Sequence, residues 1–179
     1  MKNAIIIHGT KDTPDLYWFP YLKKNLEELG YEVWAPQMPN SEVPNVKDWL
    51  PFVLSNGKFS EETILIGHSA GAQLVLSILE NITPQIKKAL LVSGYSEPLR
   101  NNDETKDHGK FDYEKIKKHA AELIFVNSDD DPWGCDDKQG KIMFDNLGGM
   151  LIIRHDGHMG STMFNQPYKE FPLLLKLLI

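Results

Sequence analysis

The sequence has little cysteine and no long apolar run. Cys135 is the only cysteine among 179 residues, which excludes an intramolecular disulfide. A membrane-spanning helix needs roughly 20 consecutive apolar residues, and the apolar segment at the C-terminus is interrupted by Pro172 and Lys176. The apolar run near the N-terminus is too short for a signal peptide. We therefore expect a cytoplasmic protein without a membrane association.

Positive charge is also scarce. The 19 lysines and arginines face 25 aspartates and glutamates, which gives a net charge of −6 and a pI near 5.5. Such a chain has no positive field that would attract nucleic acid or acidic lipid, so neither is an expected partner. The sequence contains no H-E-x-x-H, no H-x-E-x-H and no cysteine–histidine set. We expect no cofactor and no metal; His155 and His158 with the nearby aspartates are the weaker, metal-binding alternative.

The sequence does contain short apolar runs that alternate with segments of helical period. The runs are continuously apolar, which is typical of strands covered on both faces. They occupy residues 4–7, 32–35, 63–66, 89–93, 123–127 and 150–153. Strand–helix alternation implies a parallel sheet with helices on both faces. We predict one domain over residues 1–179, of class α/β: a three-layer α/β/α sandwich whose sheet has about six strands.

The clearest predicted helix, 17–29, is amphipathic and ends at Gly30. Further helices are expected at 45–54, 74–79, 113–119, 138–147 and 168–178. The proline-rich connection 36–51 and the polar loop 95–110 are candidate loops over a site. The segment between the fourth strand and residue 131 already holds a loop, a helix and a strand, so no cap domain is expected.

One short motif carries most of the functional signal. Gly67-His68-Ser69-Ala70-Gly71 follows an apolar strand and precedes a helical pattern. This is the form of a nucleophile elbow, a strained turn that lifts a serine hydroxyl above the carboxyl edge of a sheet. The glycines allow the close approach of neighbouring backbone. The simpler alternative is that Ser69 only caps a helix between two turn glycines.

A serine nucleophile needs a base and a group that orients the base. In folds with this motif the chain order is serine, acid, histidine, and the sequence supplies "NSDDDPWG" after the fifth strand and "RHDGHMG" after the sixth. Asp129, Asp130 and Asp131 are all candidate acids; Asp131 is preferred because Pro132 restricts its backbone. Of the two histidines, His158 is preferred over His155 because its glycine-flanked loop can turn back over the sheet.

The first strand ends in "HGT", and the loop after it supplies an oxyanion N–H in such folds. Thr10 is the candidate donor, together with the N–H of Ala70 behind the serine. The remaining histidines are interpreted as structural: His8, His68, His108 and His119.

Taken together, these segments resemble the small serine hydrolases of the retinoblastoma-binding protein 9 type and their bacterial relatives, in the α/β-hydrolase superfamily. The resemblance rests on "IIIHGT", "YWFPYLKKNLEELG", "LIGHSAGA", "ALLVSGY", "SDDDPW" and "DGHM". It implies Ser69 as nucleophile, Asp131 as acid and His158 as base, and an esterase or peptidase-like activity. The Leu-x-Cys-x-Glu motif for pocket proteins of the retinoblastoma type is absent, so that partner is not expected.

We therefore expect a serine hydrolase that cleaves a small ester, or an amide or peptide, through an acyl-enzyme. Without a cap domain the pocket should be open and shallow and should favour short acyl groups. Aromatic and sulfur side chains in the bordering loops are candidate pocket residues, with ordinary packing as the alternative: Tyr17, Trp18, Tyr95, Trp133 and Met159. The rival hypothesis is a binding or regulatory protein on a hydrolase scaffold.

Overall fold

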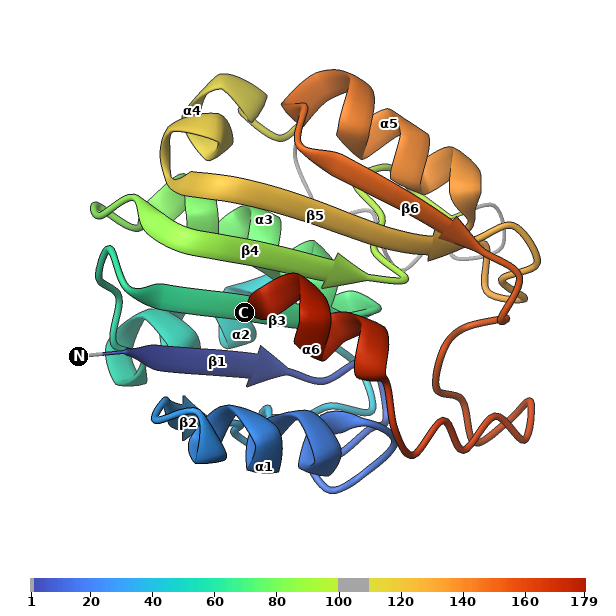
Figure 1. Ribbon diagram of the computed structural model, residues 1–179. Coiled ribbons are helices and arrows are strands. Elements are labelled where there is room, and N and C mark those ends of the chain that lie inside the picture. Colours follow the sequence, from blue (N-terminus) through green and yellow to red (C-terminus); the bar gives the residue numbers. More distant parts are fainter. Residues whose placement is uncertain (1, 100–109) are drawn as a thin grey trace.

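All six strands of the computed structural model, which describes residues 2–99 and 110–179, lie in one parallel sheet. Their order across the sheet is β2-β1-β3-β4-β5-β6 (Figure 1). The strands are β1 (Asn3–Ile7), β2 (Glu32–Trp34), β3 (Thr63–His68), β4 (Ile86–Val92), β5 (Ala120–Ser128) and β6 (Met150–Arg154). The predicted α/β class and the six-stranded parallel sheet are confirmed.

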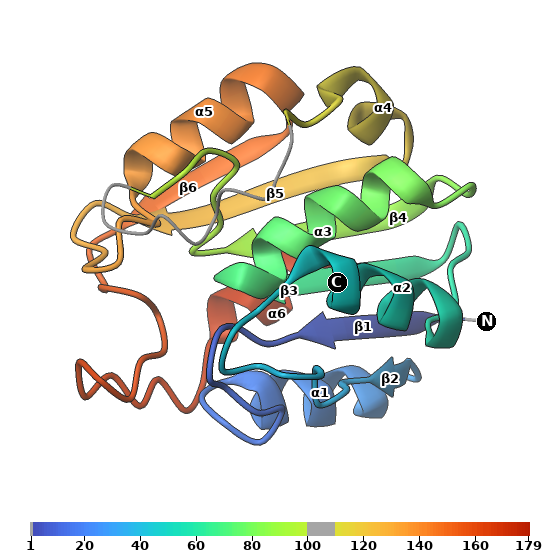
Figure 2. The same ribbon diagram turned by 180° about the vertical axis from the view of Figure 1, so that it is seen from behind.

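Helices cover both faces of the sheet. One face carries α1 (Phe19–Glu28) and α6 (Pro172–Leu178), which lie in front of the strands in Figure 1. The opposite face, turned to the viewer in Figure 2, carries the other four helices. These are α2 (Val46–Asn56), α3 (Ala70–Asn81), α4 (Tyr113–Lys118) and α5 (Asp137–Leu147). Among the described residues no further domain covers the sheet, in agreement with the predicted absence of a cap.

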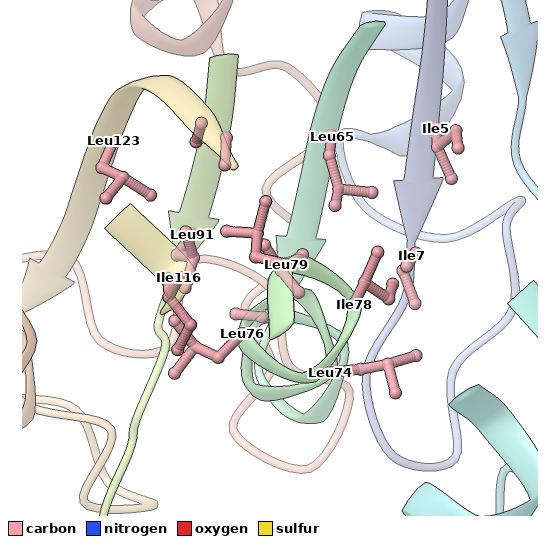
Figure 3. Packing of buried hydrophobic residues seen from close by; sticks show 14 of the residues in the cluster. Ile5, Ile7, Leu65, Leu74, Leu76, Ile78, Leu79, Leu91, Ile116 and Leu123 are labelled. Carbon is pink, nitrogen blue, oxygen red and sulfur yellow. The ribbon is translucent and has the colours of Figure 1, made fainter. Parts of the chain in front are cut away.

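Alternate residues of each buried strand enter different cores, because successive side chains of a strand point to opposite faces. Ile5 and Ile7 belong to the core under α3, whereas Ala4 and Ile6 belong to the core under α1 and α6. Figure 3 shows the first core, where leucines and isoleucines of α3 pack on β1, β3, β4 and β5. Two-sided burial explains why these strands read as continuous apolar runs in the sequence.

Several element ends differ from the predicted ones. Strand β4 begins at Ile86 and not at 89. The apolar run in the sequence starts only after Lys88, but Lys88 is buried within the strand, and its Nζ donates to the carbonyl of Leu177, 2.6 Å away. Helix α6 begins at Pro172 and not at 168, since proline lacks an N–H and suits a first helical turn. Strand β6, at the sheet edge, is half exposed rather than covered on both faces.

The parallel arrangement brings the carboxyl ends of all strands to one edge, where sites form in open α/β sheets. The segments that leave β1, β3, β5 and β6 contain every residue of the predicted triad and oxyanion hole. Most of the 95–110 loop, with His108, lies outside the described residues. None of the helices among the described residues has the length and apolar composition that a membrane span requires.

Candidate active site

The turn between β3 and α3 holds Ser69 in a strained backbone conformation. Its φ is 55° and its ψ is −120°, a region that costs a non-glycine residue about 1–3 kcal/mol. The flanking glycines are required by space: a Cβ on Gly67 would lie 2.4 Å from the Gly71 carbonyl oxygen, and one on Gly71 would lie 2.4 Å from that of Ile7. The Ser69 N–H donates to the Val92 carbonyl at 2.9 Å. Neighbouring strands therefore hold the turn at the sheet edge.

A buried carboxylate–imidazole pair lies among the loops that follow β5 and β6. Nδ1 of His158 is 2.7 Å from Oδ2 of Asp131, and both residues are less than a tenth exposed. The other carboxylate oxygen of Asp131 accepts a hydrogen bond from the Trp133 N–H at 2.9 Å. Because an ionised carboxylate only accepts, Nδ1 carries the hydrogen, and Nε2 of a neutral ring has the free lone pair. This is the tautomer that a general base requires.

The backbone of the His158 loop is fixed from several sides. Nε2 of His68 and Oγ of Ser93 both donate to the His158 carbonyl, at 2.9 and 3.0 Å. The His158 N–H donates to the Gln166 side chain at 2.9 Å, and the indole N–H of Trp18 donates to the next carbonyl, that of residue 159, at 2.9 Å. The first contact comes from the residue that precedes Ser69. The candidate base is thus tied directly to the serine turn.

Electrostatics favour an unprotonated His158 at neutral pH. Burial lowers its pKa from the ordinary 6.5, because a charged imidazolium loses hydration in the interior. The hydrogen bond to Asp131 acts in the opposite direction but has a smaller effect. A neutral imidazole beside a carboxylate can accept a proton and then be stabilised by that carboxylate.

The surroundings of Ser69 include the loop after β1. A Cβ on Gly9 would lie 3.0 Å from the Ser69 Cβ and 2.9 Å from Oδ2 of Asp12, so this loop runs against the serine. Thr10 follows Gly9 and is exposed, and Ala70 is the first residue of α3, where N–H groups have no intrahelical partner. Both predicted oxyanion donors therefore belong to segments adjacent to Ser69.

Cys135, which the sequence does not single out as a site residue, lies beside the serine. Cys135 is almost wholly buried, and the Ser69 hydroxyl is close enough to affect the ionisation of its thiol. Burial raises the pKa of the thiol well above its usual range, so the group is protonated. The thiol sulfur, an imidazole nitrogen of His158 and a carboxylate oxygen of Asp131 lie within 4.8 Å of one another.

The alternative acids and the alternative histidine lie at the surface. Nδ1 of His155 is 2.7 Å from Oδ1 of Asp129, in an exposed pair. Asp130 accepts hydrogen bonds from the Ser128 hydroxyl and the Gly157 N–H, so it braces the loop that carries the other histidine. Asp129, Asp130 and His155 form a second group of potential metal ligands, and all three residues are exposed. The three candidate acids thus occupy different environments: Asp131 is buried, whereas Asp129 and Asp130 are exposed.

Four of the five predicted pocket residues are buried. Trp18 and Met159 are fully buried in the core under α1 and α6, and Tyr95 is buried near Cys135. Tyr17 is buried too; its hydroxyl donates to Asp12 at 3.0 Å, and its side chain borders a cavity of about 170 Å³.

Trp133 is the predicted pocket residue that reaches solvent. It is 39% exposed and its ring centroid lies 6.4 Å from that of His158. Phe164, which sequence reasoning missed, packs edge-on against it with centroids 5.3 Å apart and is 45% exposed. We call Trp133 and Phe164 the aromatic rim. These two exposed aromatic rings give the surface near the candidate base an apolar character.

Known proteins resemble this chain over most of its length. The model of the serine hydrolase family matches residues 4–178. The protein YdeN of Bacillus subtilis (strain 168) is 34% identical over 137 residues, which cover 73% of this chain and 71% of YdeN. The serine hydrolase RBBP9 of Rattus norvegicus is 32% identical over 174 residues, which cover 91% of this chain and 90% of RBBP9.

Solved structures agree with these sequence matches. The crystal structure of the ydeN gene product from B. subtilis has a TM-score of 0.90 at 28% identity and covers 99% of this chain and 97% of that one. Est1E from Butyrivibrio proteoclasticus, with ferulic acid bound, has a TM-score of 0.69 at 16% identity, and the match covers 99% of this chain and 86% of Est1E. The second likeness shows a shared fold.

Proposed function

Because the chain belongs to the serine hydrolase family, we propose that it hydrolyses small carboxylic esters through an acyl-enzyme on Ser69. The observation that carries this proposal is the buried Asp131–His158 pair, whose histidine backbone is bound by the residue next to Ser69. The strained φ of Ser69 supports it as well, because strain of this kind clusters at functional sites.

In the proposed first step, Oγ of Ser69 attacks the ester carbonyl carbon while Nε2 of His158 takes the hydroxyl proton. The carbonyl π electrons move to oxygen, which becomes an oxyanion, and Asp131 stabilises the imidazolium through Nδ1–H. The tetrahedral intermediate then expels the alcohol, which receives the proton from His158. In the second step a water molecule attacks the acyl-enzyme carbonyl in the same way while His158 takes a proton from the water. The carboxylic acid is then released, and Ser69 recovers its hydrogen from His158.

The proposed oxyanion donors are the backbone N–H groups of Thr10 and Ala70. Loss of one such donor typically raises the barrier by about 3 kcal/mol. Ala70 also lies at the start of a helix of 12 residues, whose N-terminal partial positive charge favours a developing anion. The helix and the loop after β1 would thus stabilise charge from two sides.

The proposed substrate is an ester with a short acyl group, in keeping with a site that no further domain covers among the described residues. The aromatic rim would contact the part of the substrate nearest His158. Because His158 protonates the departing alcohol, we assign the rim to the leaving group. Rates that rise steadily with acyl chain length across a series of p-nitrophenyl esters would contradict the short-acyl preference.

Active-site labelling with a fluorophosphonate, together with hydrolysis of p-nitrophenyl acetate, tests the proposal. The parent protein should be labelled and active, and Ser69→Ala and His158→Ala should lose both properties. Ser55→Ala is the matched control, because Ser55 is exposed in α2. An unlabelled and inactive parent would favour a binding or regulatory protein on a hydrolase scaffold, and a labelled Ser69→Ala would refute the assignment of the nucleophile.

A further inference from the structure

Cys135 lies inside the candidate active site but has no part in the proposed reaction. It is 1% exposed, and its sulfur lies within 4.8 Å of a carboxylate oxygen of Asp131 and of a ring nitrogen of His158. A thiol, an imidazole and a carboxylate are the three side-chain types that bind zinc. We propose that Cys135, His158 and Asp131 together form an inhibitory site for a thiophilic divalent cation of the Zn²⁺ or Cd²⁺ class.

The distances suit such a site after a small movement. The three ligand atoms lie within 4.8 Å of one another. On a tetrahedral zinc, with bonds of about 2.3 Å to sulfur and about 2.0 Å to nitrogen or oxygen, ligand atoms lie roughly 3.3–3.7 Å apart. The thiol sulfur therefore needs to approach the other two ligand atoms by at most about 1.5 Å, whereas Oδ2 of Asp131 and Nδ1 of His158, now 2.7 Å apart, need to separate slightly. We assign the fourth position to the Ser69 hydroxyl, which is close enough to affect the ionisation of the thiol, or to a water that it holds.

The donor set also predicts which cations bind. A thiolate is a soft ligand and selects Zn²⁺ or Cd²⁺ over Mg²⁺ and Ca²⁺, which prefer oxygen. On binding, the Cys135 thiol releases its proton to solvent and its sulfur bonds to the metal, while the hydrogen of His158 moves from Nδ1 to Nε2 so that the Nδ1 lone pair, on the side of Asp131, bonds to the metal. No redox step is involved. With a hydrogen on Nε2, His158 no longer accepts the Ser69 proton.

Inhibition rests on the proposed function, whereas cation binding does not. The sequence offers one cysteine, so a thiolate-to-metal absorption band reports on Cys135 alone. The exposed group of Asp129, Asp130 and His155 contains no sulfur and provides an internal comparison. A cation held there gives no thiolate band and leaves the buried histidine free.

The decisive experiment is a titration of the full chain with Cd²⁺ or Co²⁺, followed by ultraviolet absorption. We expect a stoichiometric thiolate-to-metal band in the parent, in Asp129→Asn and in the inactive Ser69→Ala variant, and its loss in Cys135→Ser. Cys135→Ala serves the same purpose if the serine variant is unstable. A parent without the band, or a band that survives in both cysteine variants, would overturn the site.

The second readout is ester hydrolysis with and without Zn²⁺, each variant compared with its own metal-free rate. We expect saturating Zn²⁺ to reduce the parent rate at least tenfold, reversibly by chelation, and to leave the cysteine variants uninhibited. Asp129→Asn should respond as the parent does. If Zn²⁺ inhibits the cysteine variants equally, the proposal is wrong. A band in a protein without hydrolytic activity would support the cation site and reject the proposed function.

Discussion

Nε2 of His68 lies 2.9 Å from the backbone carbonyl oxygen of His158, and the two rings are 4.8 Å apart. Since a carbonyl only accepts, His68 donates from Nε2. Its other nitrogen has no hydrogen-bond partner among the described residues, and Oδ2 of Asp12 is 3.8 Å away. One side chain of the serine turn therefore contributes directly to the position of the candidate base.

Replacement of His68 by phenylalanine should reduce kcat while leaving KM nearly unchanged. The ring volume is kept but the donor is lost, so His158 shifts relative to Ser69; a misplacement of about 1 Å can cost about 100-fold in rate. Ser93 still satisfies the carbonyl at 3.0 Å, so the protein should remain folded. Steady-state kinetics and thermal unfolding measure both effects.

His68→Gln is the matched control, because its amide N–H can reach the same carbonyl. It should recover most of the rate that His68→Phe loses. Equal activity of His68→Phe and the parent would show that this hydrogen bond does not position the base.

Gly71→Ala should destabilise the fold by more than about 3 kcal/mol, because the new methyl would meet two backbone carbonyl oxygens of the β1 end. The distances are 2.4 Å to Ile7 and 2.6 Å to His8. Gly30→Ala is the control: Gly30 has φ +83° but no atom within 4 Å, so its cost should be about 1–2 kcal/mol. Urea unfolding compares the two; similar losses would contradict the steric explanation.

Asp131→Asn should lower kcat by about 10⁴-fold, since an amide favours the wrong tautomer of His158 and cannot stabilise its charge. Asp129→Asn removes a carboxylate from the neighbouring exposed pair and should leave kcat within about twofold. Both variants are measured against the same p-nitrophenyl ester. A larger loss for Asp129→Asn would reverse the assignment of the acid.

The acid limb of kcat/KM should have its midpoint below pH 6.5, the ordinary value for histidine. The base must be neutral, and burial lowers the pKa of His158, so activity persists to lower pH than for an exposed histidine. His155 is the useful contrast, because its hydrogen bond to Asp129 raises its pKa. A midpoint above 6.5 that disappears in His155→Gln would identify His155 as the titrating group.

Trp133→Ala should raise KM for esters with aromatic leaving groups by about five- to tenfold, equivalent to about 1–1.4 kcal/mol of contact energy. The kcat value should change little, because the hydrogen bond to Asp131 is donated by the backbone N–H of residue 133 and is kept in the variant. Phe144→Ala, which removes a similarly exposed ring from α5, should leave KM unchanged. Methyl esters of the same acids should show little effect of either change.

The sequence by itself determined the sheet and the serine motif. Continuous apolar runs predicted the strands because both of their faces are buried, and Gly67 and Gly71 predicted the turn because backbone passes too close for a side chain. The sequence predicted the ends of helices and strands less well. The start of β4 was missed because Lys88 is charged, and a buried lysine fits a covered strand only when a residue distant in the sequence accepts its hydrogen bond, as the Leu177 carbonyl does.

Only the tertiary structure decided which side chains meet. Three successive aspartates and two nearby histidines look alike in sequence, and the packing of the loops after β5 and β6 pairs Asp131 with His158 and Asp129 with His155. The same packing brings Cys135 close to Ser69, 66 positions earlier in the chain. Such contacts join loops from separate strands and depend on side-chain direction, whereas the sequence pattern records only periodicity within one segment.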